Sequence, residues 1–260
     1  VIGAINGVAP VAAPVIGGLL TGSVGWQGIF MILLFIGILL GIGCIRFKES
    51  LPAEKRSKTG VWATFRSFGI IVHNRRYMLY VFQLAFAQGI LFAYIASSPF
   101  IIQQHYGFSP FAFSICFAVN AVAIGVAAAL SVKFRRTENG TLTGCVGMLV
   151  FAVLQMAALY SGCGFWTYEL LMFALLFMMG LTFTASTTLA MDCERRYAGA
   201  ASALLGALCF ASGGIVSPLV GLGDILISTG VTFVICAVCS LLCALWAVKR
   251  TGPKVALCRI

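Results

Sequence analysis

The stretch NGVAPVAAPVIGGLL, residues 6–20, contains two prolines, three glycines and an asparagine, and it carries no charge. In a water-soluble protein this composition is typical of a loop, because proline and glycine interrupt helices. The stretch nevertheless lies within an apolar run that begins at Val1 and continues nearly to Trp26. A membrane-spanning helix tolerates both residue types, because neighbouring helices satisfy or cover the backbone groups that they free. The solvent around the chain, water or lipid, therefore decides between loop and helix.

The composition of the whole chain favours lipid. Of its 260 residues, 61% are hydrophobic and 9% are charged, whereas a soluble domain has about 25% charged residues. The apolar runs are continuous and close to the length of a membrane helix, so they do not fit the alternating strands of a barrel. We therefore predict an all-α integral membrane protein. Since the chain begins without Met, a basic segment or a cleavage site, we expect a piece of a longer protein rather than a signal peptide.

Eight apolar runs are each long enough to cross a bilayer at the rise of an α-helix. They cover residues 1–20, 27–45, 77–98, 111–132, 142–160, 168–190, 198–220 and 225–248.

The basic residues are distributed asymmetrically between these runs. All 17 Lys and Arg side chains fall in 46–76, 133–140, 191–197 and 249–260. The alternate connections, near 21–26, 99–110, 161–167 and 221–224, contain none. The positive-inside rule then places the basic segments and both termini in the cytoplasm. The net charge of +10 is thus explained by topology, and no nucleic-acid partner is expected.

The longest polar segment, residues 46–76, divides the chain. Residues 1–45 hold two spans, 77–248 hold six, and 249–260 form a cytoplasmic tail. The middle of the basic linker has no apolar period, and its end, VWATFRSFGIIV at 61–72, could form a short amphipathic helix on the inner membrane surface. Two spans followed by six are what remains of a six-plus-six transporter without its first four helices.

Several segments resemble the major facilitator superfamily, and within it the bicyclomycin-resistance (Bcr/CflA) branch of drug:proton antiporters. Residues 92–121, FAYIASSPFIIQQHYGFSPFAFSICFAVNA, resemble the seventh span of that branch, the outer loop and the entry to the eighth span. Residues 198–221, AGAASALLGALCFASGGIVSPLVG, resemble its eleventh span. Residues 13–20, APVIGGLL, followed by Trp26 and Phe30, resemble the end of the fifth span and the start of the sixth. The resemblance covers essentially the whole chain and implies a partial major facilitator fold.

The opening stretch resembles the antiporter signature of this family, G-x8-G-x3-G-P-x2-G-G. Pro14, Gly17 and Gly18 match it, whereas Ala9 and Ala13 stand where glycines are usual. The resemblance implies that these residues and Pro10 form a bent, closely packed helix that seals the transport path. It also implies a partner helix within 198–220, where small residues should allow close helix approach. These small residues are Gly199, Ala203, Gly206, Gly213 and Gly214.

A second set of polar residues lies inside the predicted spans. Tyr80, Gln83, Tyr94 and Ser98 fall within about 60° of one another on a helix. They form either a wall of the substrate cavity or a set of helix–helix hydrogen bonds, and the resemblance favours the wall because the family's seventh span lines the pathway. Asn120 likewise either lines the cavity or fixes a contact between helices.

Glu169 is the one ionisable residue within a predicted span, so it is a candidate proton site. Its position at the outer end of that span favours the other reading, a hydrated carboxylate at a helix start. The family's usual coupling acid belongs to the first four spans, together with a basic loop and an arginine. None of these can be assigned here, so we expect the given chain not to transport by itself.

No combination of residues typical of an enzyme, a cofactor site or a metal site is present. Cys236, Cys239 and Cys243 lie close together in one span but have no His or acid nearby. The expected function is therefore proton-coupled multidrug efflux by alternating access, in a bacterial inner membrane. Its partners would be the lipid bilayer, protons and a small lipophilic drug, and the full-length protein would be a monomer. Alternatives are a metabolite exporter or importer of the same fold, and a non-transporting membrane scaffold.

Overall fold

The structure, a computed structural model, describes residues 2–47, 68–134 and 136–249, and the regular elements within these ranges are all helical. This agrees with the predicted all-α membrane fold. The elements are α1 (Ile2–Arg46), α3 (Arg75–Pro99), η2 (Phe100–His105), α4 (Pro110–Ser131), α5 (Thr137–Tyr160), α6 (Phe165–Cys193), η3 (Arg195–Tyr197), α7 (Ala198–Leu219) and α8 (Ile225–Lys249). Most of the expected linker and nearly all of the expected tail lie outside the described ranges, although 68–73 is helical.

Seven described segments are long and apolar enough to cross a membrane, and they correspond to the last seven of the eight expected spans. They are Gly22–Arg46, Arg75–His105, Pro110–Ser131, Thr137–Tyr160, Phe165–Cys193, Arg195–Leu219 and Ile225–Lys249. Large apolar side chains point outward from them, for example Phe210 at 71% and Ile215 at 67% exposure. Such a surface suits hydrocarbon rather than water.

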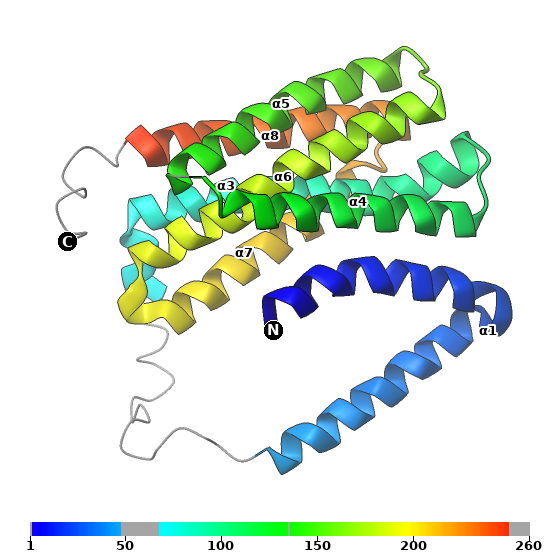
Figure 1. The fold of residues 1–260 in the computed structure, drawn as a ribbon, viewed down its shortest axis with the longest axis horizontal. Coiled ribbons are helices and arrows are strands. Elements are labelled where there is room, and N and C mark those ends of the chain that lie inside the picture. The colour runs from blue at the N-terminus through cyan, green and yellow to red at the C-terminus, as the bar shows by residue number, and fades with distance from the viewer. Residues whose placement is uncertain (1, 48–67, 135, 250–260) are drawn as a thin grey trace.

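The opening stretch is helical throughout, because it forms part of the first arm of α1. The two expected helices 1–20 and 27–45 are joined by a sharp bend rather than by a loop at 21–26. At the bend Gly25 has φ 64° and ψ 179°, a conformation essentially restricted to glycine. The two arms of α1 consequently diverge in a V (Figure 1).

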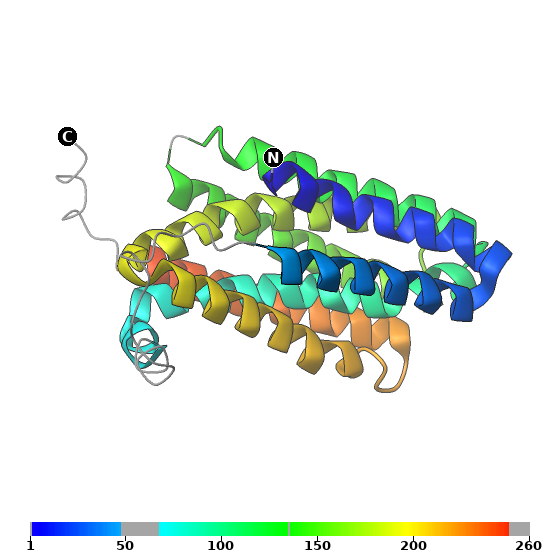
Figure 2. The ribbon, with the colours of Figure 1, turned by 90° about the horizontal axis from the view of Figure 1, so that it is seen from below.

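The six helices α3 to α8 form a bundle with α3 in contact with α6, α7 and α8 (Figures 1 and 2). Glycines let some of these helices approach closely. A Cβ added at Gly180 of α6 would lie 2.5 Å from the Ile124 carbonyl oxygen of α4. A Cβ added at Gly213 of α7 would lie 2.5 Å from the Phe92 ring of α3. Substitution at these glycines would therefore force helices apart.

The first arm of α1 packs against α4. We expected this arm to pack against a helix within residues 198–220. For the described part of the chain that prediction is wrong, because the arm contacts α4. The reason lies in α7, which uses Gly213 against α3 instead. At Gly199, Gly206 and Gly214 an added Cβ would meet no atom within 4 Å, and Ala203 is exposed.

The expected outer loop at 99–110 is too long, because the helix continues through η2 to His105. Pro99 has no backbone N–H to donate, and a wider π-turn follows it. In that turn the Tyr106 N–H donates to the Ile101 carbonyl at 3.1 Å. Ile101 and Ile102 are buried there, so the turn is part of the packed bundle.

Candidate functional site

Three of the predicted site residues meet inside the bundle, each from a different helix. Asn120 lies at the centre of α4, and its Nδ2 donates to Glu169 Oε1 of α6 at 2.8 Å. The same Nδ2 donates to Tyr94 Oη of α3 at 3.1 Å. The two protons of one amide nitrogen thus connect three helices. We call Tyr94, Asn120 and Glu169 the polar triad.

Aromatic rings border the triad. The Tyr94 ring stacks on Phe117, with centroids 5.3 Å apart and an interplanar angle of 19°. At the end of the bundle that holds η2, Tyr106 packs against Tyr168, with centroids 5.8 Å apart. Burial raises the pKa of Tyr106, so its phenol stays neutral and donates to the Cys163 carbonyl at 2.9 Å. The triad is therefore a small polar group in a largely aromatic setting.

The triad leaves several buried polar atoms without a hydrogen-bond partner. They are Glu169 Oε2, Asn120 Oδ1 and the nearby hydroxyls of Ser98 and Tyr168. Buried polar atoms are rarely left in this state, so each exception calls for an explanation. The triad can therefore accept further hydrogen bonds without losing those it has.

Glu169 differs from the hydrated carboxylate at a helix start that its position favoured. One of its oxygens is bonded to Asn120, and the other is inaccessible. Among the residues described, the ion pair that forms is Arg195 to Asp192 at 2.9 Å, at the opposite end of α6. The helix position alone could not reveal this, because Asn120 comes from another helix.

The predicted polar face of α3 divides between two environments. Gln83 Nε2 donates to Ser240 Oγ of α8 at 3.2 Å and contacts Cys145 Sγ of α5 at 3.4 Å. Ser240 Oγ in turn donates to the Gln83 carbonyl at 3.1 Å. Gln83 thus joins three helices, which is the alternative to a cavity wall. Tyr80 is buried near the start of α3, with the Arg76 guanidinium 5.9 Å from its ring centroid.

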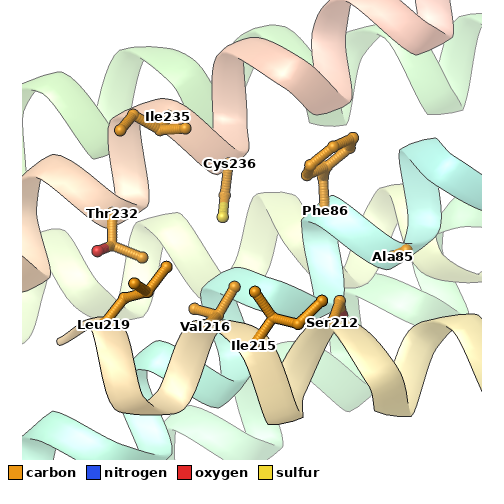
Figure 3. A pocket seen from close by; sticks show the side chains of 9 residues that line it. All are labelled: Ala85, Phe86, Ser212, Ile215, Val216, Leu219, Thr232, Ile235 and Cys236. Atoms are coloured by element: carbon orange, nitrogen blue, oxygen red, sulfur yellow. The ribbon is translucent and has the colours of Figure 1, made fainter.

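A pocket of about 230 Å³ lies elsewhere, between α3, α7 and α8 (Figure 3). Its lining consists of Ala85, Phe86, Ser212, Ile215, Val216, Leu219, Thr232, Ile235 and Cys236. None of the five predicted cavity residues belongs to this set. The Ser212 and Thr232 hydroxyls bond to carbonyls of their own helices, so the pocket presents an apolar surface. This pocket could not be predicted from the sequence, because its lining residues are ordinary for a membrane helix.

A further group of residues, which sequence reasoning missed, connects the start of α3 to the end of α6 and to α7. Asn74 Nδ2 donates to Glu194 Oε1 at 2.6 Å, while its Oδ1 caps α3 at the Tyr77 N–H. Tyr77 Oη donates to the Ala201 carbonyl of α7 at 2.6 Å. The start of α3 is thereby fixed to the connection between α6 and α7.

The residues of the antiporter signature lie in the first arm of α1, where the backbone is helical. The side-chain surroundings of Ala9, Pro10, Ala13, Pro14 and Gly18 are outside the described part of the structure. At Gly17 an added Cβ would meet no atom within 4 Å. The predicted role as a hinge and seal stays a prediction. Groups of His, Cys, Asp or Glu suited to a metal ion are absent from the described ranges.

Known proteins match the chain along most of its length. A family model of the Major Facilitator Superfamily matches residues 1–218. An uncharacterized MFS-type transporter, YdgK of Bacillus subtilis (strain 168), is 37% identical over 227 residues, which are 85% of this chain and 56% of the relative. A bicyclomycin resistance protein homolog of Haemophilus influenzae is 28% identical over 227 residues, 82% of this chain and 54% of the relative. The multidrug transporter MdfA of Edwardsiella ictaluri is 26% identical over 104 residues, 40% of this chain and 25% of the relative. The chain spans about half the length of the first two relatives.

Proposed function

Because the chain belongs to the Major Facilitator Superfamily, we propose that it is part of a proton-coupled exporter of small lipophilic drugs in a bacterial inner membrane. The observation that carries this proposal is the likeness to a bicyclomycin resistance protein homolog over 82% of the chain. The weaker likeness to a multidrug transporter points in the same direction. Membership of this superfamily makes the chain a transporter component rather than an enzyme.

The fold supports transport by alternating access. Helices α3 to α8 form one packed body, while the second arm of α1 is not buried against it. In the proposed full-length protein, a monomer, two such bodies would rock about a central cavity. The first arm of α1, which carries the signature residues, contacts α4, and the uncovered small residues of α7 would pack against spans of the half to which α1 belongs. The basic connections and both ends of the chain would face the cytoplasm.

The described side chains fit a lipophilic substrate better than a charged metabolite. The pocket between α3, α7 and α8 is lined by apolar groups, and the triad is bordered by aromatic rings. Apolar and aromatic surfaces of this kind suit a lipophilic compound, so the drug exporter is the better-supported reading.

The test is an efflux assay on the natural gene in a bacterial host that lacks its own drug exporters. Cells expressing the gene should accumulate less of a fluorescent lipophilic dye than control cells, and an uncoupler should abolish the difference. Dye export that persists with the uncoupler would overturn proton coupling. Unchanged dye accumulation, with the protein present in the membrane, would overturn drug export. The 260-residue chain expressed alone should insert without exporting dye.

A further inference from the structure

The proposed function assigns no role to the carboxyl group of Glu169. We propose that Glu169 is a proton-binding site of the α3–α8 body, and that it holds its proton in the conformation seen here. The site would act in addition to any acid among the spans that precede this chain. Its use in coupling rests on the function proposed above, whereas proton binding itself can be measured without a drug.

The Glu169 carboxyl group has few hydrogen-bond donors around it. An ionised carboxylate offers about four acceptor positions on its two oxygens. In the structure Glu169 receives one donor, Asn120 Nδ2, and its second oxygen is buried without a partner. An ionised carboxylate removed from water needs compensating donors or a cation, whereas the neutral acid needs far less. The geometry around Glu169 is therefore that of a neutral acid.

The ionisable neighbours of Glu169 carry no positive charge. The ionisable side chains that act on or around Glu169 are Tyr94 from α3, Cys116 from α4 and Tyr168 from α6 itself. The ionisable side chains that α5 and α7 bury are Cys145 and Cys209. Phenols and thiols are uncharged at neutral pH. No neighbour on any helix packed against α6 thus supplies the positive charge that would hold Glu169 as a carboxylate.

The neutral acid also has a route for its proton. Asn120 donates to Glu169 Oε1, so the acidic hydrogen of the neutral acid belongs on Oε2, the oxygen without a partner. In another conformation of the transport cycle, water would reach Oε2. The O–H bond of Glu169 would then break and its proton would pass to water as hydronium, while the carboxylate keeps the Asn120 donor. The reverse step takes the proton back from hydronium and restores the conformation seen here.

The test is infrared spectroscopy of the purified natural protein in lipid nanodiscs at neutral pH, without drug. The wild-type spectrum should contain the C=O band of a protonated carboxylic acid, and Glu169→Gln should lose that band. Asp192→Asn is the matched control, because it removes an exposed, ion-paired carboxylate from the other end of the same helix, and it should keep the band. Identical spectra of the wild type and a correctly folded Glu169→Gln protein would overturn the proposal.

A second variant separates a folding defect from the loss of the proton. Glu169→Asp keeps an acid on the shorter side chain, and it should show a protonated-acid band at a shifted frequency. If Glu169→Gln does not fold and Glu169→Asp folds without any such band, the proposal is likewise overturned. If the band is present but the wild type exports no dye, the proton site stands and the proposed drug export fails.

Discussion

Replacement of Asn120 by alanine should destabilise the bundle, because this one side chain connects three helices. The change removes the bonds to Glu169 Oε1 at 2.8 Å and to Tyr94 Oη at 3.1 Å. Hydrogen bonds between membrane helices contribute about 0.6 kcal/mol on average and about 1.7 kcal/mol at most. Two such bonds predict that the free energy of unfolding falls by about 1–3 kcal/mol.

The assay is reversible unfolding in mixed micelles, followed by circular dichroism. Asn139→Ala is the matched control, because Asn139 is an exposed residue in the first turn of α5. A surface substitution of this kind should change the unfolding free energy by less than about 0.5 kcal/mol.

A double-mutant cycle isolates one bond of the triad. Tyr94→Phe removes the hydroxyl that Asn120 bonds to and keeps the ring that stacks on Phe117. The coupling between Asn120→Ala and Tyr94→Phe should lie at about 0.6–1.7 kcal/mol. A coupling within about 0.3–0.5 kcal/mol of zero, the range for independent sites, would refute the three-helix connection through Asn120.

Three further substitutions test other contacts by the same unfolding assay or by transport. Gly180→Ala should lower the free energy of unfolding by about 1–3 kcal/mol through overpacking against an α4 carbonyl. Gly214→Ala is its control and should not lower it, because no atom lies near the added Cβ. Equal stability of the two variants would argue against the close α4–α6 contact. Gly25→Ala should lower the free energy of unfolding by about 1–3 kcal/mol, because Gly25 has a backbone conformation that alanine rarely adopts. Gly37→Ala is its control, since Gly37 lies in regular helix with open space around it. A loss at Gly25→Ala no larger than that of the control would contradict the bend. Gly17→Val in the natural protein should impair drug exchange and leave membrane insertion intact. Unimpaired exchange would contradict the role of the signature as a hinge and seal.

The spans were predictable from the sequence because two independent signals agree. Hydropathy supplied the lengths, and the Lys and Arg positions supplied the alternation of sides. The limits of the helices were less accurate where local backbone chemistry intervenes. After Pro99 the chain continues as a π-turn, where a loop was expected. At Gly25 the helix bends sharply, where a loop at 21–26 was expected. Neither effect alters hydropathy.

Which residues share one face of a helix was predictable from the sequence, but which neighbours they contact was not. Periodicity placed Tyr80, Gln83, Tyr94 and Ser98 on one face of α3, but a face can meet several neighbours. Gln83 meets α5 and α8, whereas Tyr94 meets Asn120 of α4. The surroundings of Glu169 could not be derived from its position along α6, because its partner is about fifty residues away in sequence. Contacts between helices depend on crossing angles and side-chain shapes that a single helix does not encode.

Drug-driven proton movement tests the central claim, proton-coupled export, most directly. The natural protein would be reconstituted into liposomes loaded with a lipophilic drug and a pH-sensitive dye, then diluted into drug-free buffer. Antiport predicts that the lumen acidifies as the drug leaves, because each drug molecule that exits is exchanged for entering protons. Drug release at the same protein-dependent rate with no change in lumenal pH would contradict the account.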